Sequence, residues 1–270
     1  MSLKCYVGAA VLATLGLSAG PARAQEAQET RNGSEWEVLV GAGAFYGPDY
    51  LGSKDYGFSP GLIGSLQKGP YYVKLVGTRI TANVLPFEAI YAGPLIGYGS
   101  GRKDVDDKVV DRLPDVDEEL WIGAAFGGGY DGLLLQRDSL GAGIEIAHDV
   151  MGDSGTTVTI SVGYEFNPTE RLAFGVDLST TFADAAYADA YYTVTPAGAA
   201  ASGLARYDAD PGLRDVSLDV SSRFAVTENW GLGAVAGGSV LLGSMADSPI
   251  VKDRGRRESG RGGLFLWYRF

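Results

Sequence analysis

The fold is decided by the stretch Thr156-Thr157-Val158-Thr159-Ile160-Ser161-Val162-Gly163-Tyr164-Glu165-Phe166. Every second side chain from Val158 onward is apolar, and the side chains between them are polar or small. A period of two is that of a β-strand, because successive side chains of a strand point to opposite faces. A turn follows at 167–170, and residues 172–178 repeat the alternation. The pattern predicts two antiparallel strands with one apolar and one polar face.

The same alternation recurs along the chain in segments of about ten residues, the length with which a tilted strand crosses the hydrocarbon of a bilayer. We expect twelve strands, an even number, which places both chain ends on the periplasmic side. Ten and fourteen strands stay open, because residues 70–85 are ambiguous. The predicted strands are 36–45, 57–66, 70–76, 78–85, 89–99, 118–129, 133–147, 156–166, 171–182, 214–226, 230–242 and 260–270.

A soluble β-sandwich would show the same alternation with its apolar face inward. Short turns that alternate with long polar loops favour a transmembrane, antiparallel up-and-down β-barrel instead. We expect the long loops outside the cell, at 46–56, 100–117, 148–155, 183–213 and 243–259. Aromatic side chains near predicted strand ends, where barrels have girdles, are Trp36, Tyr71, Trp121, Tyr164, Phe166, Trp230 and Trp267.

The N-terminal segment has the pattern of a secretory signal peptide. Lys4 precedes a short apolar run at 5–19, and Ala22-Arg23-Ala24 matches a cleavage site. A membrane anchor is the alternative, but the run is short for a spanning helix. We expect a signal peptide at 1–24, a disordered leader at 25–34 and the barrel domain at 35–270.

Composition excludes several classes of protein. The net charge is −11, from 22 basic and 33 acidic residues, and without Lys4 and Arg23 it becomes 20 − 33 = −13. A nucleic-acid partner is therefore not expected, because phosphates need a basic face. Cys5, the one cysteine, lies in the predicted signal peptide. The exported chain would then have neither a disulfide nor a thiolate site.

The end of the chain alternates as well. Leu264, Leu266, Tyr268 and Phe270 share one face of the last predicted strand. A terminal strand that ends on an aromatic residue resembles the segment that the barrel-assembly machinery recognises in outer-membrane proteins. We therefore assign the assembly signal to Tyr268 and Phe270.

Four passages follow one another along the predicted barrel, at 43–53, 97–104, 191–213 and 246–251. Their characteristic residues are Pro48, Tyr50, Gly52, Ser53, Arg102, Thr195, Ser202, Gly203, Leu204, Tyr207, Ser248 and Pro249. Together they resemble the MltA-interacting protein (MipA)/OmpV family of outer-membrane proteins. In the family a glycine-aspartate pair usually precedes Ser-Pro. This chain departs from that pattern, because Gly243-Ser244-Met245-Ala246-Asp247 stands before its Ser-Pro.

The resemblance implies a location in the Gram-negative outer membrane, with lipid and lipopolysaccharide around the barrel. It also implies a scaffold that joins a lytic transglycosylase to a peptidoglycan synthase. A porin-like channel for small solutes and a surface antigen or adhesin are the alternatives that the family offers.

An enzyme is not expected from the residues that could carry catalysis. His148 is the one histidine, with Asp149 beside it and Ser154 six residues later. The Gly-x-Ser-x-Gly pattern occurs at 16–20, within the predicted signal peptide, and at 57–61, within a predicted strand, and neither match has the strand–turn–helix context of a nucleophile elbow. We interpret His148 as a surface residue, and we predict no catalytic residue and no cofactor.

An acidic stretch at 104–119 contains eight carboxylates. Carboxylates can bind Ca²⁺ or bridge lipopolysaccharide through divalent ions, but the spacing differs from an EF-hand loop. We therefore expect a solvated loop and no metal site.

The polar faces of the strands carry Glu145, Glu165, Asp177, Asp219 and Arg223. In a barrel this face is the lumen, so these residues either line a pore or pair and close it. Arg223 is the only inward base that we assign to the strands from 156 to 226. The predicted periplasmic turns at 67–69, 130–132, 167–170 and 227–229 are short, which weakens the scaffold interpretation. Partners, solutes and the oligomeric state are not specified by the sequence.

Overall fold

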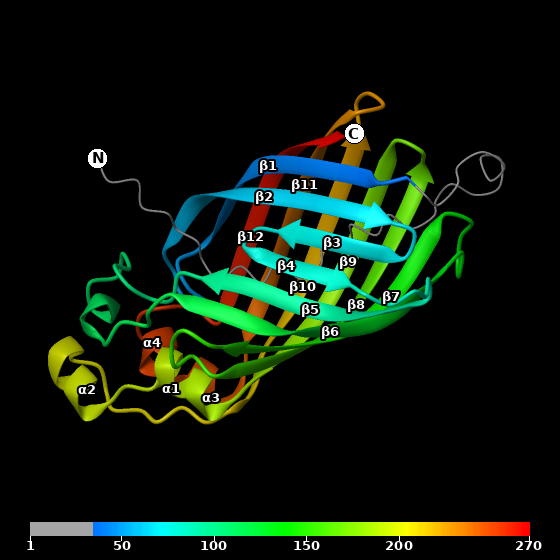
Figure 1. Ribbon diagram of the computed structural model, residues 1–270. Coiled ribbons are helices and arrows are strands. Elements are labelled where there is room, and N and C mark those ends of the chain that lie inside the picture. The colour runs from blue at the N-terminus through cyan, green and yellow to red at the C-terminus, as the bar shows by residue number, and fades with distance from the viewer. Residues whose placement is uncertain (1–34) are drawn as a thin grey trace.

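The computed structural model describes residues 35–270, so the predicted signal peptide and leader lie outside the described residues. Twelve antiparallel strands close into one barrel, in which each strand pairs with its neighbours in sequence and β12 pairs with β1 (Figure 1). The predicted barrel and its strand count are confirmed. The strands are β1 (Glu37–Pro48), β2 (Tyr56–Lys68), β3 (Tyr71–Val76), β4 (Arg79–Asn83), β5 (Ile90–Gly99), β6 (Glu119–Asp131), β7 (Asp138–Asp149), β8 (Thr156–Thr169), β9 (Leu172–Ala183), β10 (Gly212–Ala225), β11 (Trp230–Leu241) and β12 (Glu258–Arg269).

The outer wall of the barrel is apolar. Ile160 on β8, Val176 on β9 and Leu218 on β10 are 43–51% exposed on this wall. Their neighbours in sequence, such as Asp177 and Asp219, are buried inside the barrel. An exposed apolar belt of this kind is stable in a bilayer, because its side chains contact the hydrocarbon chains of the lipids. The face that we predicted to contact lipid is therefore the outer face.

Two of the predicted girdle residues are wrong. Trp121 and Trp267 are buried on the inner side, because each alternates with outward apolar neighbours on its strand. Trp36, Tyr71 and Trp230 are exposed. Trp230 also meets Tyr268 edge to face at 4.8 Å, near the chain end.

Glycines make room for the inward aromatic rings. Trp267 pairs with Gly41 on β1 and Gly231 on β11, while Phe265 pairs with Gly43 and Gly233. A Cβ atom at Gly233 would overlap the Phe265 ring. The glycine content of β1, β11 and β12 therefore has a packing cause, since a strand glycine often marks a close approach.

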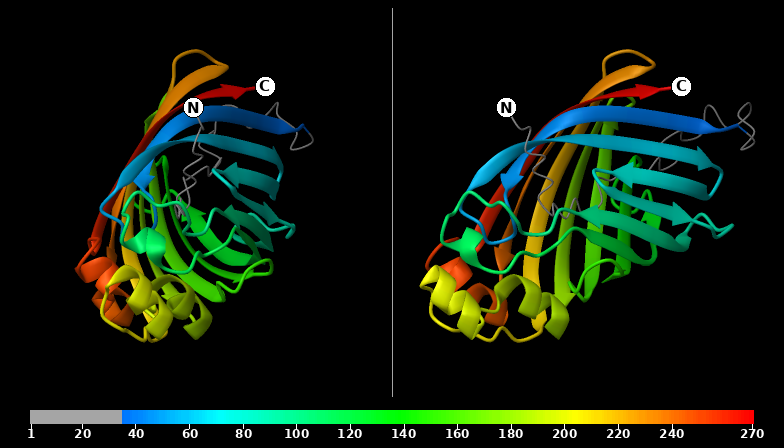
Figure 2. Two further views of the ribbon diagram at one scale, coloured as in Figure 1. Left: turned by 90° about the vertical axis from the view of Figure 1, so that its left-hand side faces the viewer. Right: turned by 60° about the vertical axis from the view of Figure 1, so that its left-hand side comes forward.

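The two ends of the barrel differ (Figures 1 and 2). The short turns lie at the end where Phe270 is, and the long loops with five short helices lie at the other. By the general rule for such barrels the short turns are periplasmic and the long loops are external. None of the helices within 35–270 is long and apolar enough to span a bilayer. The helices are η1 (Val110–Arg112), α1 (Ala185–Tyr192), α2 (Pro196–Ser202), α3 (Gly243–Asp247) and α4 (Pro249–Lys252).

Candidate functional site

The external loops fold into a helical cap over one mouth of the barrel (Figure 2). Helix α1 begins where the Asp184 carboxylate accepts the backbone N–H of Tyr187 at 3.0 Å. Helix α2 begins with Thr195 as its cap and Pro196 in its first turn, and it ends at Gly203 with φ of 83°. The predicted long loop at 183–213 thus contains two short helices, which these capping residues stabilise.

The underside of the cap packs into the barrel mouth. Tyr187, Tyr191 and Tyr192 of α1 are buried in one apolar cluster with strand residues Trp121 and Leu241. Tyr187 and Tyr191 stack with ring centroids 4.8 Å apart. Burial raises the pKa of Tyr187 to about 12, so its phenol stays neutral at physiological pH. A buried apolar and aromatic cluster therefore lies between the cap and the strand ends at this mouth.

The residues that carry the family resemblance meet in this cap. Arg102 donates one hydrogen bond to the Tyr191 carbonyl at 2.7 Å and another to the Pro114 carbonyl at 3.1 Å. Ser248 Oγ donates to the Tyr192 carbonyl at 2.6 Å. Three loops that are distant in sequence are thus joined through α1.

The other family residues shape the same cap. Tyr50 and Leu204 are buried in a second apolar cluster with Val194 and Ile250. The Tyr207 hydroxyl donates to the Ser244 carbonyl at 2.6 Å. Of the remaining residues, Pro48 ends β1, Gly52 has φ of 100° beside Leu241, Ser53 accepts the Asp55 N–H, Thr195, Ser202 and Gly203 bound α2, and Pro249 opens α4.

Asp107 ties three loops together at the outer edge of the cap. Its buried carboxylate accepts hydrogen bonds from Lys54 Nζ at 2.9 Å and Arg254 Nε at 3.1 Å. Burial alone would raise the pKa of Asp107, but these bonds and the Val109 N–H outweigh it and hold the pKa well below its usual range. The predicted solvated loop is therefore wrong at Asp107, and also at Glu119, which is buried.

The predicted lumen residues lie on the inner wall. Glu145 accepts a hydrogen bond from Arg79 at 2.5 Å, and Glu165 accepts one from Arg223 at 2.9 Å. Asp219 accepts one from Arg261 Nε at 2.8 Å, and Asp177 pairs with Asp219 in the strand register. The prediction that Arg223 is the only inward base is wrong, because buried Arg214 lies on the same strand beside Asp215.

The partners of these acids come from strands that are not neighbours. Arg223 reaches from β10 across β9 to Glu165 on β8, and Arg79 reaches from β4 to Glu145 on β7. Lys74 on β3 lies on the same inner face, near both Arg223 and Glu165. A buried charge needs such a partner, and the strand pattern alone does not show which strand supplies it.

Among the residues that the structure describes, no hydrogen bond joins His148 to Ser154, the pair considered for catalysis. His148 Nδ1 lies 3.0 Å from Thr156 Oγ1, at the exposed end of β7. The Ser154 backbone N–H donates to Asp149 at 3.3 Å. Within residues 35–270 no three histidine, aspartate or glutamate side chains gather as metal ligands.

An apolar patch that was not predicted from the sequence lies at the periplasmic end of the barrel. Residues 133–137 were predicted as strand, but they form a turn in which Leu133, Leu134 and Leu135 are 53%, 72% and 48% exposed. The Asp138 carboxylate fixes this turn by accepting the N–H groups of Leu134 and Leu135. We call the patch of Val84, Phe87, Leu133, Leu134 and Leu135 the periplasmic apolar patch.

The two turns that form the periplasmic apolar patch are held next to each other. The Gly129 N–H at the end of β6 donates to the Ala89 carbonyl before β5 at 2.9 Å. Val84 and Phe87 of the β4–β5 turn are 59% and 55% exposed. A contiguous exposed apolar patch marks a contact surface for protein or membrane.

Comparison with protein families gives one match. The family model described as MltA-interacting protein MipA matches residues 40–270. No curated protein sequence matches the chain.

Among solved structures, an outer membrane channel from Pseudomonas putida F1 is 14% identical, with 88% of this chain and 96% of that chain covered and a TM-score of 0.42. The anion-selective porin from Comamonas acidovorans is 8% identical, with 87% and 99% covered and a TM-score of 0.41. The outer membrane channel DcaP of Acinetobacter baumannii is 13% identical, with 87% and 96% covered and a TM-score of 0.35. At such low similarity these structures carry no functional information.

Proposed function

Since this chain belongs to the family of the MltA-interacting protein MipA, we propose that it is an outer-membrane barrel that binds a murein-processing enzyme at its periplasmic end. The partner would be a lytic transglycosylase, to which a peptidoglycan synthase is joined in turn. The barrel itself would act as an anchor and not as an enzyme.

The observation that carries this proposal is the periplasmic apolar patch. Short turns offer few side chains to a partner, yet five apolar groups are gathered on two adjacent turns. Asp138 holds one of these turns in a single shape, so little conformational entropy is lost when a partner binds. Leu134, at 72% exposure, would be the central contact.

The alternative of a porin-like channel is disfavoured by the other end of the barrel. The cap fills the external mouth with the tyrosines of α1, and the inner-wall acids Glu145, Glu165 and Asp219 each have a guanidinium partner. An open pore needs a continuous water path with side chains that ions can reach. A surface antigen would depend on the exposed side of the cap, which leaves the periplasmic patch unexplained.

The test is binding of an MltA-type lytic transglycosylase to the full-length barrel in lipid nanodiscs. We expect Leu134→Glu combined with Leu135→Glu to weaken binding at least tenfold, because the new charges would have to be desolvated at the contact. The matched control is Val226→Glu, which puts a charge on an exposed apolar residue of the β10–β11 turn.

Equal binding by the wild type and the double variant would overturn the proposal. If instead the wild type binds no transglycosylase but the double variant inserts poorly into membranes, the patch contacts the inner leaflet of the outer membrane.

A further inference from the structure

The β11–β12 loop differs in charge from the other external loops. This loop, at 242–257, has the four bases Lys252, Arg254, Arg256 and Arg257 and the two acids Asp247 and Asp253. The β5–β6 loop, at 100–118, has four bases and seven acids, and residues 184–211 have one base and four acids. Positive charge on the outer rim is therefore concentrated in one sector, above β11, β12 and β1.

Two arginines of this loop are available to a ligand. Arg256 is exposed, and its guanidinium forms no ion pair with any part of the chain from 35 to 270, while its backbone N–H is fixed to the Gly52 carbonyl at 2.9 Å. Within the described part of the chain, Arg257 pairs only with exposed Asp247, and 46% of its side chain is exposed. Arg254 is occupied by Asp107.

Below the loop, the outer wall carries an aromatic group at the height where a membrane interface is expected. Tyr46 on β1 contacts Tyr56 and Phe58 on β2 at ring distances of 5.3 Å and 4.8 Å. Phe58 is 72% exposed, and Tyr56 Oη accepts the Gly260 N–H at 2.9 Å. Tyrosine and other aromatics mark the headgroup level, so the arginines lie at or above the lipid headgroups.

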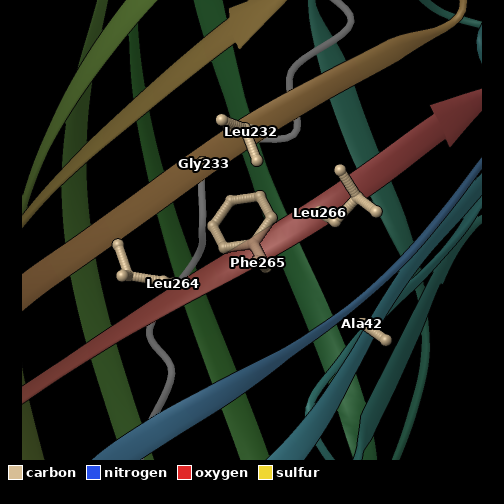
Figure 3. Close-up of a pocket in the computed structure, with 6 residues that line it drawn as sticks. All are labelled: Ala42, Leu232, Gly233, Leu264, Phe265 and Leu266. Carbon is tan, nitrogen blue, oxygen red and sulfur yellow. The ribbon is translucent and has the colours of Figure 1, made fainter.

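Further down the same wall there is an apolar hollow of about 300 Å³ (Figure 3). It is surrounded by the outward side chains Ala42, Leu232, Leu264 and Leu266, with Gly233 and Phe265 also lining it. Between the loop and the hollow, the outward positions of β12 are Gly260 and Gly262. No side chain therefore projects from the outer wall at these two positions of β12, between the basic loop and the hollow.

We propose that this sector binds a phosphorylated, multiply acylated glycolipid of the outer leaflet, of the lipid A class. Arg256 and Arg257 hold its phosphates, because guanidinium groups bind phosphate with paired hydrogen bonds. One acyl chain lies along Gly260 and Gly262 and ends in the hollow. The charge of the loop favours an anionic lipid over a neutral one, and the apolar lining of the hollow, inside the apolar belt, favours an acyl chain over a protein partner.

The experiment uses the full barrel, purified in detergent and stripped of bound lipid, with bis-phosphorylated hexa-acyl lipid A as the probe. Binding is measured by native mass spectrometry, and folding of each variant is checked by heat-modifiable gel mobility. We expect Arg256→Glu combined with Arg257→Glu to weaken binding at least tenfold. Ala42→Phe fills the hollow and should weaken binding about threefold, with the phosphate contacts retained.

The control is Lys103→Glu combined with Lys108→Glu, which makes the same charge change on the β5–β6 loop. An equal loss in this control, or no loss in the arginine variant, overturns the proposal. Lipid A without phosphates should bind weakly. Phosphatidylglycerol that binds as tightly as lipid A would show a site for any anionic phospholipid and would also overturn the assignment.

Discussion

Arg261 on β12 reaches across β11 to Asp219 on β10, and the residue that lies between them in the strand register is Gly237. A Cβ atom at Gly237 would overlap the Asp219 carboxylate. Gly175 likewise lies between Glu165 and Ser221 in the strand register, and a Cβ atom there would lie 2.6 Å from Ser221 Oγ. The high glycine content of the chain thus serves its internal ion pairs as well as its aromatic packing.

The first prediction concerns Gly237. Gly237→Leu should break the Arg261–Asp219 pair, and a buried pair that is broken costs roughly 3–5 kcal/mol. The free energy of unfolding in urea, measured in detergent or bilayers, checks it. Ala236→Leu is the control, because Ala236 is exposed on the outer wall of the same strand. A small effect of Gly237→Leu would show that the pair contributes little to stability.

The second prediction tests the two faces of β8. Ile160→Arg should destabilise the inserted barrel by roughly 2–4 kcal/mol, because it places a charge in hydrocarbon. Thr159→Arg should be far milder, because Thr159 lies inside, opposite Glu145, with its hydroxyl 3.0 Å from that of Thr181. Unfolding in lipid vesicles gives both values. Equal losses at the two positions would contradict the observed register.

Local pattern was sufficient to predict the strands. Ile160 and Thr159 could be placed on opposite faces because side chains of a strand alternate whatever its neighbours are. The partner of a lumen acid could not be predicted in this way. Arg79 and Glu145 are separated by 66 positions and lie on β4 and β7, so their contact exists only in the closed barrel.

The cap was missed although part of its signal is in the sequence. Thr195-Pro196 with Gly203 seven residues later is a start and stop pattern for a short helix. The turn at Leu133 was missed for a different reason. The three consecutive leucines include no residue that is typical of a turn. The turn is fixed by Asp138, which lies at the start of the next strand and accepts the Leu135 N–H with its side chain.

The third prediction concerns the Asp107 contact between loops. Because the pKa of folded Asp107 is below its unfolded value, its stabilising effect is complete above about pH 4 and is lost as the pH falls further. Hydrogen exchange of residues 105–113 should therefore be constant from pH 8 to 5, after correction for intrinsic rates. Asp107→Asn should lower the free energy of local opening by about 2 kcal/mol, which is the scale of hydrogen bonds to a charged group. Asp106→Asn, on an exposed neighbour, is the control.

The fourth prediction concerns assembly. Phe270 is 72% exposed and its N–H donates to the Val38 carbonyl at 3.0 Å, so it closes the seam between β12 and β1. Deletion of Phe270 should lower the amount of folded protein in the outer membrane severalfold, as measured on fractionated membranes. Val226→Ala, on a periplasmic turn outside the periplasmic apolar patch, should leave that amount unchanged. Normal levels without Phe270 would refute the assembly signal.

The last prediction separates a closed barrel from a pore. In planar bilayers the wild type should show no steady conductance, because the α1 tyrosines fill the external mouth. Ala183 and Gly212 are paired at the ends of β9 and β10, so 185–210 can be replaced by an Asn-Gly turn without separating the strands. This variant should conduct with weak ion preference, since Lys74, Arg79, Arg223 and Arg261 balance the four inner-wall acids Glu145, Glu165, Asp177 and Asp219. Adding Glu165→Gln and Asp177→Asn should shift its reversal potential toward anions, because two of those acids are then neutral. Conductance of the intact wild type would contradict the closed mouth, and an unchanged reversal potential would place Glu165 and Asp177 away from the ion path.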